Sequence, residues 1–249
     1  MANNGENDKP VVRKTWTMIK RAVRVPKYTE GMQAHWDGFQ PLNSSNQWVD
    51  VVNGYTFTPV TSSAVPVHQD NLLNFTKWGG MKSSLRTPAT SVTPYTLEIT
   101  LRDTYSATPY LSDNYGTIID TGMDSDWISY PGIHLRKFVS KVQIFYRNSS
   151  WKDPYGYVNI AKADFVPNGL DTFTFVPTKG IYRNGVCLQE TPDMIMPEEA
   201  LGIGTYPAGS YASYYKLKFK VHSVRYYPFE LTEEQIKQNY ETDKYIYGE

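Results

Sequence analysis

The stretch from Tyr215 to Ile236 reads YKLKFKVHSVRYYPFELTEEQI, and its pattern decides the fold class. The first half alternates between apolar side chains and polar ones, with Leu217, Phe219 and Val221 on one side and Lys216, Lys218, Lys220 and His222 on the other. A period of two is typical of a β-strand with one face in a core and the other in water. We therefore expect a strand over Tyr215–Tyr227, with the three lysines exposed.

The alternation shifts by one position in the middle of this strand. Val224 and Tyr226 occupy even positions, whereas the earlier apolar residues occupy odd ones. One extra residue in a strand returns the following side chains to the original face. The sequence therefore predicts a β-bulge near His222–Ser223.

The second half of the stretch opens a helix. Thr232 and Gln235 have the spacing of a capping box, and Leu231 and Ile236 flank it as a hydrophobic staple. Acidic residues at Glu233 and Glu234 suit the positive end of the helix dipole. We expect this helix to cover the sheet with Ile236, Tyr240 and Tyr247 and to end at Gly248.

The rest of the chain reads as short strands separated by turns. The 249 residues include 20 Tyr, 17 Gly and 16 Pro, which suits one large all-β domain. Asn184-Gly185 is the strongest two-residue hairpin signal, because both positions tolerate positive φ. Further strands are expected at Tyr55–Val60, Leu72–Phe75, Thr96–Arg102, Thr117–Asp120, Lys141–Tyr146, Tyr155–Ala161 and Asp171–Val176.

Charge and composition exclude several classes of protein. The 25 basic and 25 acidic residues balance, so no overall field favours nucleic acid. Cys187 is the only cysteine, which excludes an intrachain disulfide, and we expect its thiol to be buried and inert. No apolar run is long enough for membrane insertion, and the first residues lack the pattern of a signal peptide. We expect a protein made in a cytoplasm.

Residues 1–28 differ from the rest and read as a basic arm. Lysines and arginines outnumber acidic residues there, and a few apolar residues recur at helical spacing. A flexible tail and an arm that docks on a partner both fit this composition. In the second reading the docking residues are Arg13, Lys14, Trp16, Ile19, Arg21, Val23 and Arg24.

Three stretches together resemble the concanavalin A-like, laminin-G-like family. They are MQAHWDG at 32–38 followed by WVD at 48–50, IYRNGV at 181–186, and the strand–helix ending from Val224 to Tyr240. The resemblance implies an all-β, two-sheet antiparallel jelly-roll sandwich over residues 29–249 with a C-terminal helix. Domains that end in this way are similar to ones in tailed-bacteriophage virion proteins, which implies other virion proteins as partners of the arm, an oligomer and a virion location.

The enzymatic branch of that family places Glu-x-Asp-x-x-Glu on one strand, and retention requires two carboxylates about 5–5.5 Å apart. The nearest string here has Glu98, then Thr100 in place of the central acid, and Asp103. The plain alternative is an ordinary strand with these groups facing solvent. The histidines His35, His68, His134 and His222 read as surface residues. We expect a non-enzymatic protein, with a glycosidase as the alternative.

Two further sites are suggested by loop residues. Asp120, Asp124 and Asp126 could supply oxygen ligands to Ca²⁺, but their spacing lacks the glutamate at position 12 of an EF-hand loop, which favours an acidic solvated turn. Aromatic residues that could stack on a sugar or form a protein interface gather in the expected loops: Tyr105, Tyr110, Tyr115, Trp127, Tyr130, Trp151 and Tyr155. Together with these residues, the resemblance implies a structural or adhesive virion component that binds host or mucus glycans, with a purely structural protein as the alternative.

Overall fold

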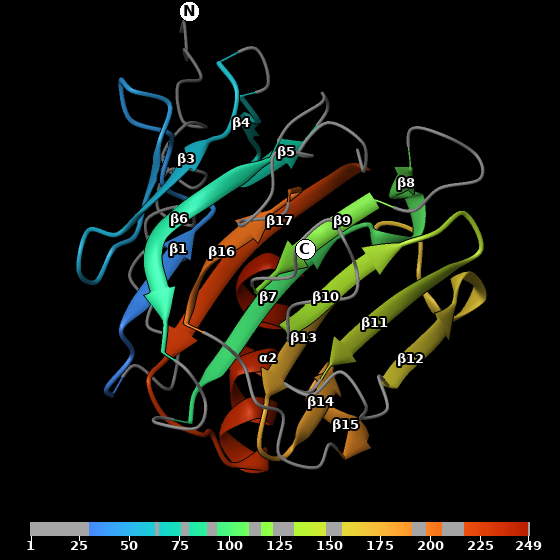
Figure 1. The fold of residues 1–249 in the computed structure, drawn as a ribbon. Helices are drawn as coiled ribbons and strands as arrows, with labels where there is room; N and C mark the ends of the chain where they lie inside the picture. The colour runs from blue at the N-terminus through green and yellow to red at the C-terminus, as the bar shows by residue number, and fades with distance from the viewer. Residues whose placement is uncertain are drawn as a thin grey trace, which may run out of the picture.

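The computed structural model describes residues 30–62, 65–75, 80–88, 94–109, 116–121, 132–147, 156–190, 198–205 and 217–248. Within these residues the strands form two antiparallel sheets that face each other (Figure 1). This arrangement confirms the expected all-β sandwich. The N-terminal arm lies outside the described residues.

The first sheet has nine strands within the described residues, in the order β15-β14-β13-β7-β17-β5-β4, with β1 and β8 also paired to β17. Their bounds are β1 Ala34–Asp37, β4 Val67–Gln69, β5 Leu72–Phe75, β7 Thr96–Arg102, β8 Thr108–Pro109, β13 Leu170–Val176, β14 Gly180–Arg183, β15 Val186–Glu190 and β17 Leu217–Tyr227.

The second sheet has eight strands within the same residues, in the order β12-β11-β10-β9-β16-β6-β3-β2. Their bounds are β2 Trp48–Val49, β3 Thr56–Pro59, β6 Met81–Thr87, β9 Gly116–Asp120, β10 Gly132–Lys137, β11 Lys141–Arg147, β12 Gly156–Ala161 and β16 Glu199–Ile203. Short 3₁₀ turns, η1 Thr104–Ser106 and η2 Lys162–Asp164, follow β7 and β12.

The core lies between the two sheets. It consists of the side chains that point inward at alternate positions of each strand. Leu217, Phe219 and Val221 are buried there and Lys218 is exposed, as the alternation predicts. Lys220 was expected to be exposed but is half-buried. Lys216 lies outside the described residues. The register of β17 against β7 shifts between Val221 and Ser223, which confirms the bulge and returns the end of the strand to the core.

The Asn184-Gly185 turn and the helix also follow the sequence signals. Asn184 and Gly185 both have positive φ, at 54° and 79°, and join β14 to β15 as a two-residue hairpin. Helix α2, Glu233–Tyr247, begins at a complete Thr232–Gln235 capping box and ends at Gly248. Among the described residues, no helix is long and apolar enough to cross a membrane.

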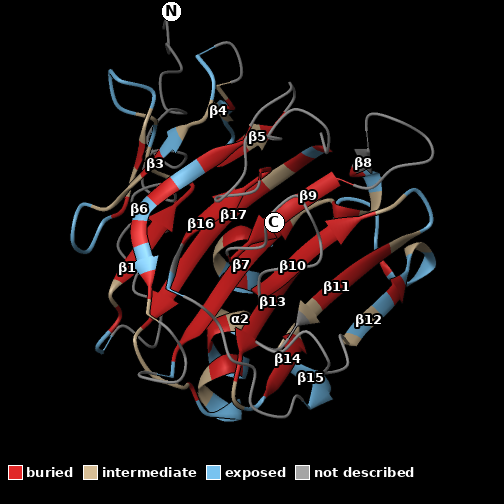
Figure 2. Ribbon diagram, viewed as in Figure 1, coloured by how far each residue is buried: buried red, intermediate tan, exposed pale blue. Residues whose placement is uncertain are grey.

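Helix α2 covers the face of the nine-stranded sheet that is turned away from the other sheet (Figure 1). The residues that alternate with the core on β7, β13 and β17 are therefore buried beneath a helix rather than hydrated (Figure 2). His222 shows the consequence, since its ring stacks on Tyr247 at 4.6 Å and it is buried. The expectation of an outward, wet position for His222 is wrong because the helix packs over that end of β17.

Cys187 departs from expectation in the opposite direction. It lies on β15, which is the last strand of its sheet and is exposed along its whole length. The thiol is therefore exposed rather than buried, because an edge strand at this position has no layer above it.

Candidate functional site

Glu98, the first carboxylate of the glycosidase-like string, lies on β7 beneath helix α2. Its side chain accepts hydrogen bonds from Asn239 Nδ2 at 2.8 Å and Thr174 Oγ1 at 3.0 Å, and it lies 3.6 Å from Arg225 Nη1. Burial raises the pKa of Glu98 to about 7, although the positive charge of Arg225 opposes this shift. The sequence-based expectation of a solvent-facing Glu98 is therefore wrong.

Arg225 and Asp243 complete this buried group. The guanidinium of Arg225 donates through both terminal nitrogens to the Asp243 carboxylate, one of them at 3.0 Å, and Asp243 also accepts from Thr100 Oγ1 at 2.6 Å. Both side chains are essentially inaccessible to solvent. The group joins α2 to the sheet through these hydrogen bonds and ion pairs.

Asp103, the second carboxylate of the string, lies elsewhere. It adopts a left-handed conformation just past the end of β7, and its Oδ1 accepts from the backbone N–H of Asn168 at 2.9 Å. Five residues of extended chain span about 16 Å. Glu98 and Asp103 therefore do not form the close carboxylate pair that a retaining mechanism requires.

Asp120, the described member of the calcium candidates, ends β9 and is fully buried. Its Oδ2 lies 3.9 Å from Nδ1 of His134, whose Nε2 lies 3.1 Å from Thr117 Oγ1. Burial lowers the pKa of His134 well below its usual value. Asp124 and Asp126 lie outside the described residues, so a calcium site at this position stays a prediction. In the described ranges no three His, Cys, Asp or Glu residues gather as a metal site would require.

The expectation that the four histidines are surface residues is wrong. His35, His134 and His222 are buried, and His68 is half-buried with its Nε2 2.6 Å from the carbonyl of Gly38. Strand alternation alone does not predict such burial, which for His222 results from the packing of α2.

Of the aromatic candidates, the structure describes Tyr105, which packs against the core in η1 with Lys162 Nζ 4.6 Å from its ring centroid. This half-buried position supports a structural role for Tyr105. The others fall in segments outside the described residues: Tyr110 and Tyr115 between β8 and β9, Trp127 and Tyr130 between β9 and β10, and Trp151 and Tyr155 between β11 and β12.

A candidate site that the sequence did not reveal lies on the outer face of β10, β11 and β12. The strand register places Arg136, Gln143 and Asn159 side by side across these strands. Arg136 donates from Nε to Gln143 Oε1 at 2.8 Å, and Gln143 Nε2 donates to Asn159 Oδ1 at 2.8 Å. The amide oxygen of the exposed residue Asn159 accepts this hydrogen bond, so its amide nitrogen points away from Gln143 and can donate to another group.

Aromatic rings surround this polar ladder. The guanidinium carbon of Arg136 lies 5.2 Å from the Phe145 ring centroid, and Lys141 Nζ lies 5.1 Å from the Phe138 centroid. On β12, Tyr157 pairs with Phe145 across the strands and is 55% exposed. Arg136, Gln143 and Phe145 are buried, so the accessible part of this face is the β12 edge with Tyr157 and Asn159 (Figure 2).

This edge places three groups in one row, which are the phenol ring of Tyr157, the amide donor of Asn159 and the ammonium group of Lys141. Tyr157 and Asn159 are two residues apart on one strand, which places them about 7 Å apart, and Lys141 follows on the neighbouring strand. The alternation within the expected strands at 141–146 and 155–161 indicates which residues share this face. The pattern of a single strand does not show which strands lie side by side, so the sequence did not reveal the site.

Comparison with known proteins supports the fold and does not identify a family. No family model matches the chain, and no curated protein matches its sequence. Among solved structures, Trypanosoma rangeli sialidase in complex with sialic acid aligns with a TM-score of 0.62 and 14% identity, over 94% of this chain and 38% of that chain. A botulinum neurotoxin serotype D ligand-binding domain in complex with N-acetylneuraminic acid aligns with a TM-score of 0.57 and 14% identity, over 85% of this chain and 51% of that chain.

A third structure, the receptor-binding domain of a botulinum neurotoxin C/D mosaic, gives a TM-score of 0.54 at 13% identity, over 86% of this chain and 52% of that chain. The chain thus spans about two fifths to one half of these proteins. At such identities the likeness shows the shared β-sandwich fold alone.

Proposed function

We propose that this protein is a non-enzymatic glycan-binding module whose site is the β11–β12 edge, formed by Lys141, Tyr157 and Asn159. The observation that carries the proposal is the Arg136–Gln143–Asn159 ladder, which fixes an exposed amide donor beside an exposed aromatic ring. Sugar rings have apolar faces that stack on aromatic side chains, and a fixed amide gives directional hydrogen bonds to hydroxyl or acetamido groups.

The ligand class that fits this edge best is an acidic sugar. Lys141 and Arg136 place positive charge on the face, and Lys141 lies in the row with the ring and the amide. A carboxylate on the sugar would interact with that ammonium group. The sandwich proteins described above that were solved with sialic acid or N-acetylneuraminic acid make sialylated glycans the first class to examine.

A glycan array with the full chain tests this proposal. We expect binding concentrated on sialylated or uronic acid-containing glycans, and loss of that binding in Tyr157→Ala and Asn159→Ala. Tyr245→Ala is the matched control, because Tyr245 is 62% exposed on the distant helix α2. An array without signal would favour the purely structural alternative, and release of free sugar from a bound glycan would overturn the non-enzymatic assignment.

We further propose that the protein is a virion component that is attached through its N-terminal arm. The basis is the family resemblance of the strand–helix ending together with the basic, sparsely apolar composition of residues 1–28. Ordering such a segment costs roughly 1–2 kcal/mol per residue in backbone entropy. Burying Trp16, Ile19 and Val23 would recover only about 1.5–3 kcal/mol each, so the arm needs a partner surface.

Deleting residues 2–27 tests this attachment. We expect a folded, soluble sandwich that no longer co-purifies with phage particles, as followed by mass spectrometry of purified virions. A truncated chain that is still incorporated would contradict the docking role. One that fails to fold would show that the arm belongs to the domain core.

A further inference from the structure

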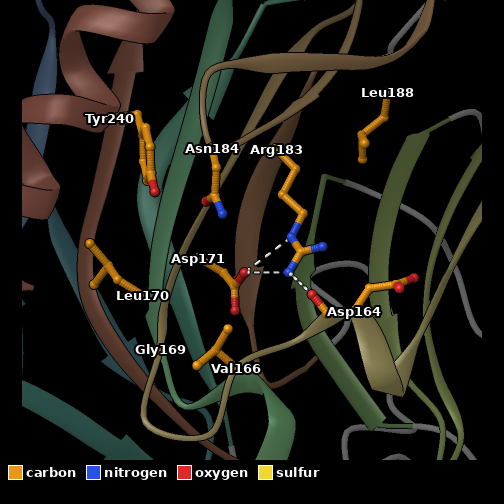
Figure 3. Close-up of a pocket in the computed structure, with 9 residues that line it drawn as sticks. All are labelled: Asp164, Val166, Gly169, Leu170, Asp171, Arg183, Asn184, Leu188 and Tyr240. Carbon is orange, nitrogen blue, oxygen red and sulfur yellow. Dashed lines mark hydrogen bonds and ion pairs between the residues drawn. The ribbon is translucent and has the colours of Figure 1, made fainter.

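A pocket of about 460 Å³ opens at the end of the sandwich where the chain crosses from β12 to β13 (Figure 3). It is lined by Asp164, Val166, Gly169, Leu170, Asp171, Arg183, Asn184, Leu188 and Tyr240. These residues come from the end of η2 and the loop after it, the start of β13, the β14–β15 hairpin and helix α2. None of them belongs to the β11–β12 edge, and the volume lies within the range typical of small-molecule sites.

Arg183 forms one wall of the pocket in a fixed orientation. Its Nε and Nη2 donate to Asp171 Oδ1 at 3.0 and 2.8 Å, and Nη2 also donates to the carbonyl of Asp164 at 2.9 Å (Figure 3). The guanidinium carbon lies 4.0 Å from the Phe165 ring centroid. Among the described residues no acceptor engages Nη1, so this nitrogen keeps its donors for another group.

Asn184 supplies a second fixed donor. Its Oδ1 accepts from the backbone N–H of Thr172 at 2.8 Å, and its own backbone N–H donates to the carbonyl of Thr172 at 2.8 Å. Since the amide oxygen is engaged by the sheet, the amide nitrogen is directed to the opposite side. Figure 3 shows this nitrogen on the side of Arg183.

The remaining wall is apolar, with one carboxylate at its margin. Val166, Leu170 and Leu188 line it together with the side chain of Tyr240, which reaches in from α2 (Figure 3). Val166 is 68% exposed and Leu188 is 37% exposed, so apolar surface is held open to water here. Asp164 carries an exposed carboxylate that can accept a hydrogen bond.

These groups select the chemistry of a ligand. The carboxylates of Asp164 and Asp171 disfavour an anion, and the fixed donors on Arg183 and Asn184 disfavour a cation. A hydroxyl group both donates and accepts, so neighbouring hydroxyls can satisfy an amide donor and a carboxylate together. An apolar wall with an aromatic side chain suits the C–H face of a sugar ring.

We propose that this pocket is a second binding site, which takes one neutral sugar ring and acts independently of the acidic-glycan edge. The full chain is titrated with neutral monosaccharides, namely glucose, galactose, mannose and N-acetylglucosamine, and binding is followed by saturation-transfer NMR and calorimetry. We expect saturable binding of at least one of these sugars, and about a tenfold loss of affinity in Tyr240→Ala and in Leu188→Ser.

The controls separate this site from the proposed function. Tyr245→Ala lies on the same helix outside the pocket and should bind as the wild type does, and circular dichroism confirms that each variant is folded. Tyr157→Ala should abolish acidic-glycan binding and leave neutral-sugar binding unchanged. No saturable binding of any neutral sugar would overturn the proposal, as would wild-type affinity in folded Tyr240→Ala and Leu188→Ser, or loss of binding in Tyr157→Ala.

Discussion

Asn239 on the C-terminal helix donates a hydrogen bond to Glu98 on β7 at 2.8 Å, and both side chains are buried. This contact explains why a carboxylate that resembles a catalytic residue in sequence is a structural one. One oxygen of Glu98 accepts from Asn239 on the helix and the other accepts from Thr174 on β13, so both oxygens are engaged where the helix packs on the sheet.

The first prediction concerns the pH dependence of stability. Burial raises the pKa of folded Glu98 to about 7 from 4.5. The contribution of Glu98 to the unfolding free energy is therefore fully present below pH 4.5 and is lost as the pH rises through 7. The unfolding free energy of Glu98→Gln minus that of the wild type should therefore increase by up to about 3 kcal/mol between pH 4.5 and pH 8. Urea denaturation of both proteins at each pH measures this difference.

The comparison with the variant is needed because His222 acts in the opposite direction. Burial lowers the pKa of folded His222 to about 4 from 6.5, so its contribution is present above pH 6.5 and is lost as the pH falls through 4. His222 is common to both proteins, and its effect cancels in the difference. A difference in unfolding free energy that does not change with pH would show that folding does not raise the pKa of Glu98.

The second prediction is that the Arg225–Asp243 pair is essential to helix docking. Asp243→Ala leaves a buried guanidinium with its main partner removed, which typically costs about 3–5 kcal/mol of unfolding free energy. Glu241→Ala on the same helix is the control, since its ion pair with Lys244 is exposed and should contribute less than about 1 kcal/mol. Equal effects of the two substitutions on thermal unfolding would contradict the assignment.

The third prediction concerns Lys137, whose buried Nζ makes no hydrogen bond with the described residues and lies 5.6 Å from the Phe165 ring centroid. Burial lowers its pKa to about 8 from 10.5, so its contribution is present above pH 10.5 and is lost as the pH falls through 8. At pH 7 the charged form is therefore a cost, and Lys137→Met should raise the unfolding free energy by about 1–3 kcal/mol.

A matched substitution checks the Lys137 prediction. Lys218→Met replaces an exposed lysine on β17 and should change the unfolding free energy at pH 7 by less than about 0.5 kcal/mol. Destabilisation by Lys137→Met at that pH would mean that the ammonium group is held by favourable interactions that outweigh its burial.

The sequence predicted local features well because they depend on neighbouring residues. The capping box at Thr232, the hairpin at Asn184 and the bulge after Val221 each follow from a few adjacent side chains. The bounds of β5 and β7 were also predicted correctly, since both strands have clear limits in the pattern.

Features that depend on distant segments were not predictable in this way. Glu98 and His222 occupy outward strand positions, and only the docking of α2 decides that they are buried. The Arg136–Gln143–Asn159 ladder likewise depends on the register of β10, β11 and β12, which a single strand does not specify. Cys187 illustrates the converse, because its exposure follows from the edge position of β15.

The most direct test of the account is a crystal structure of the full chain with the strongest acidic glycan found on the array. We predict a sugar ring against the Tyr157 side chain, with the amide nitrogen of Asn159 within hydrogen-bonding distance of the sugar and its carboxylate near Lys141. A bound acidic glycan at any other position on the molecule would contradict the proposed site.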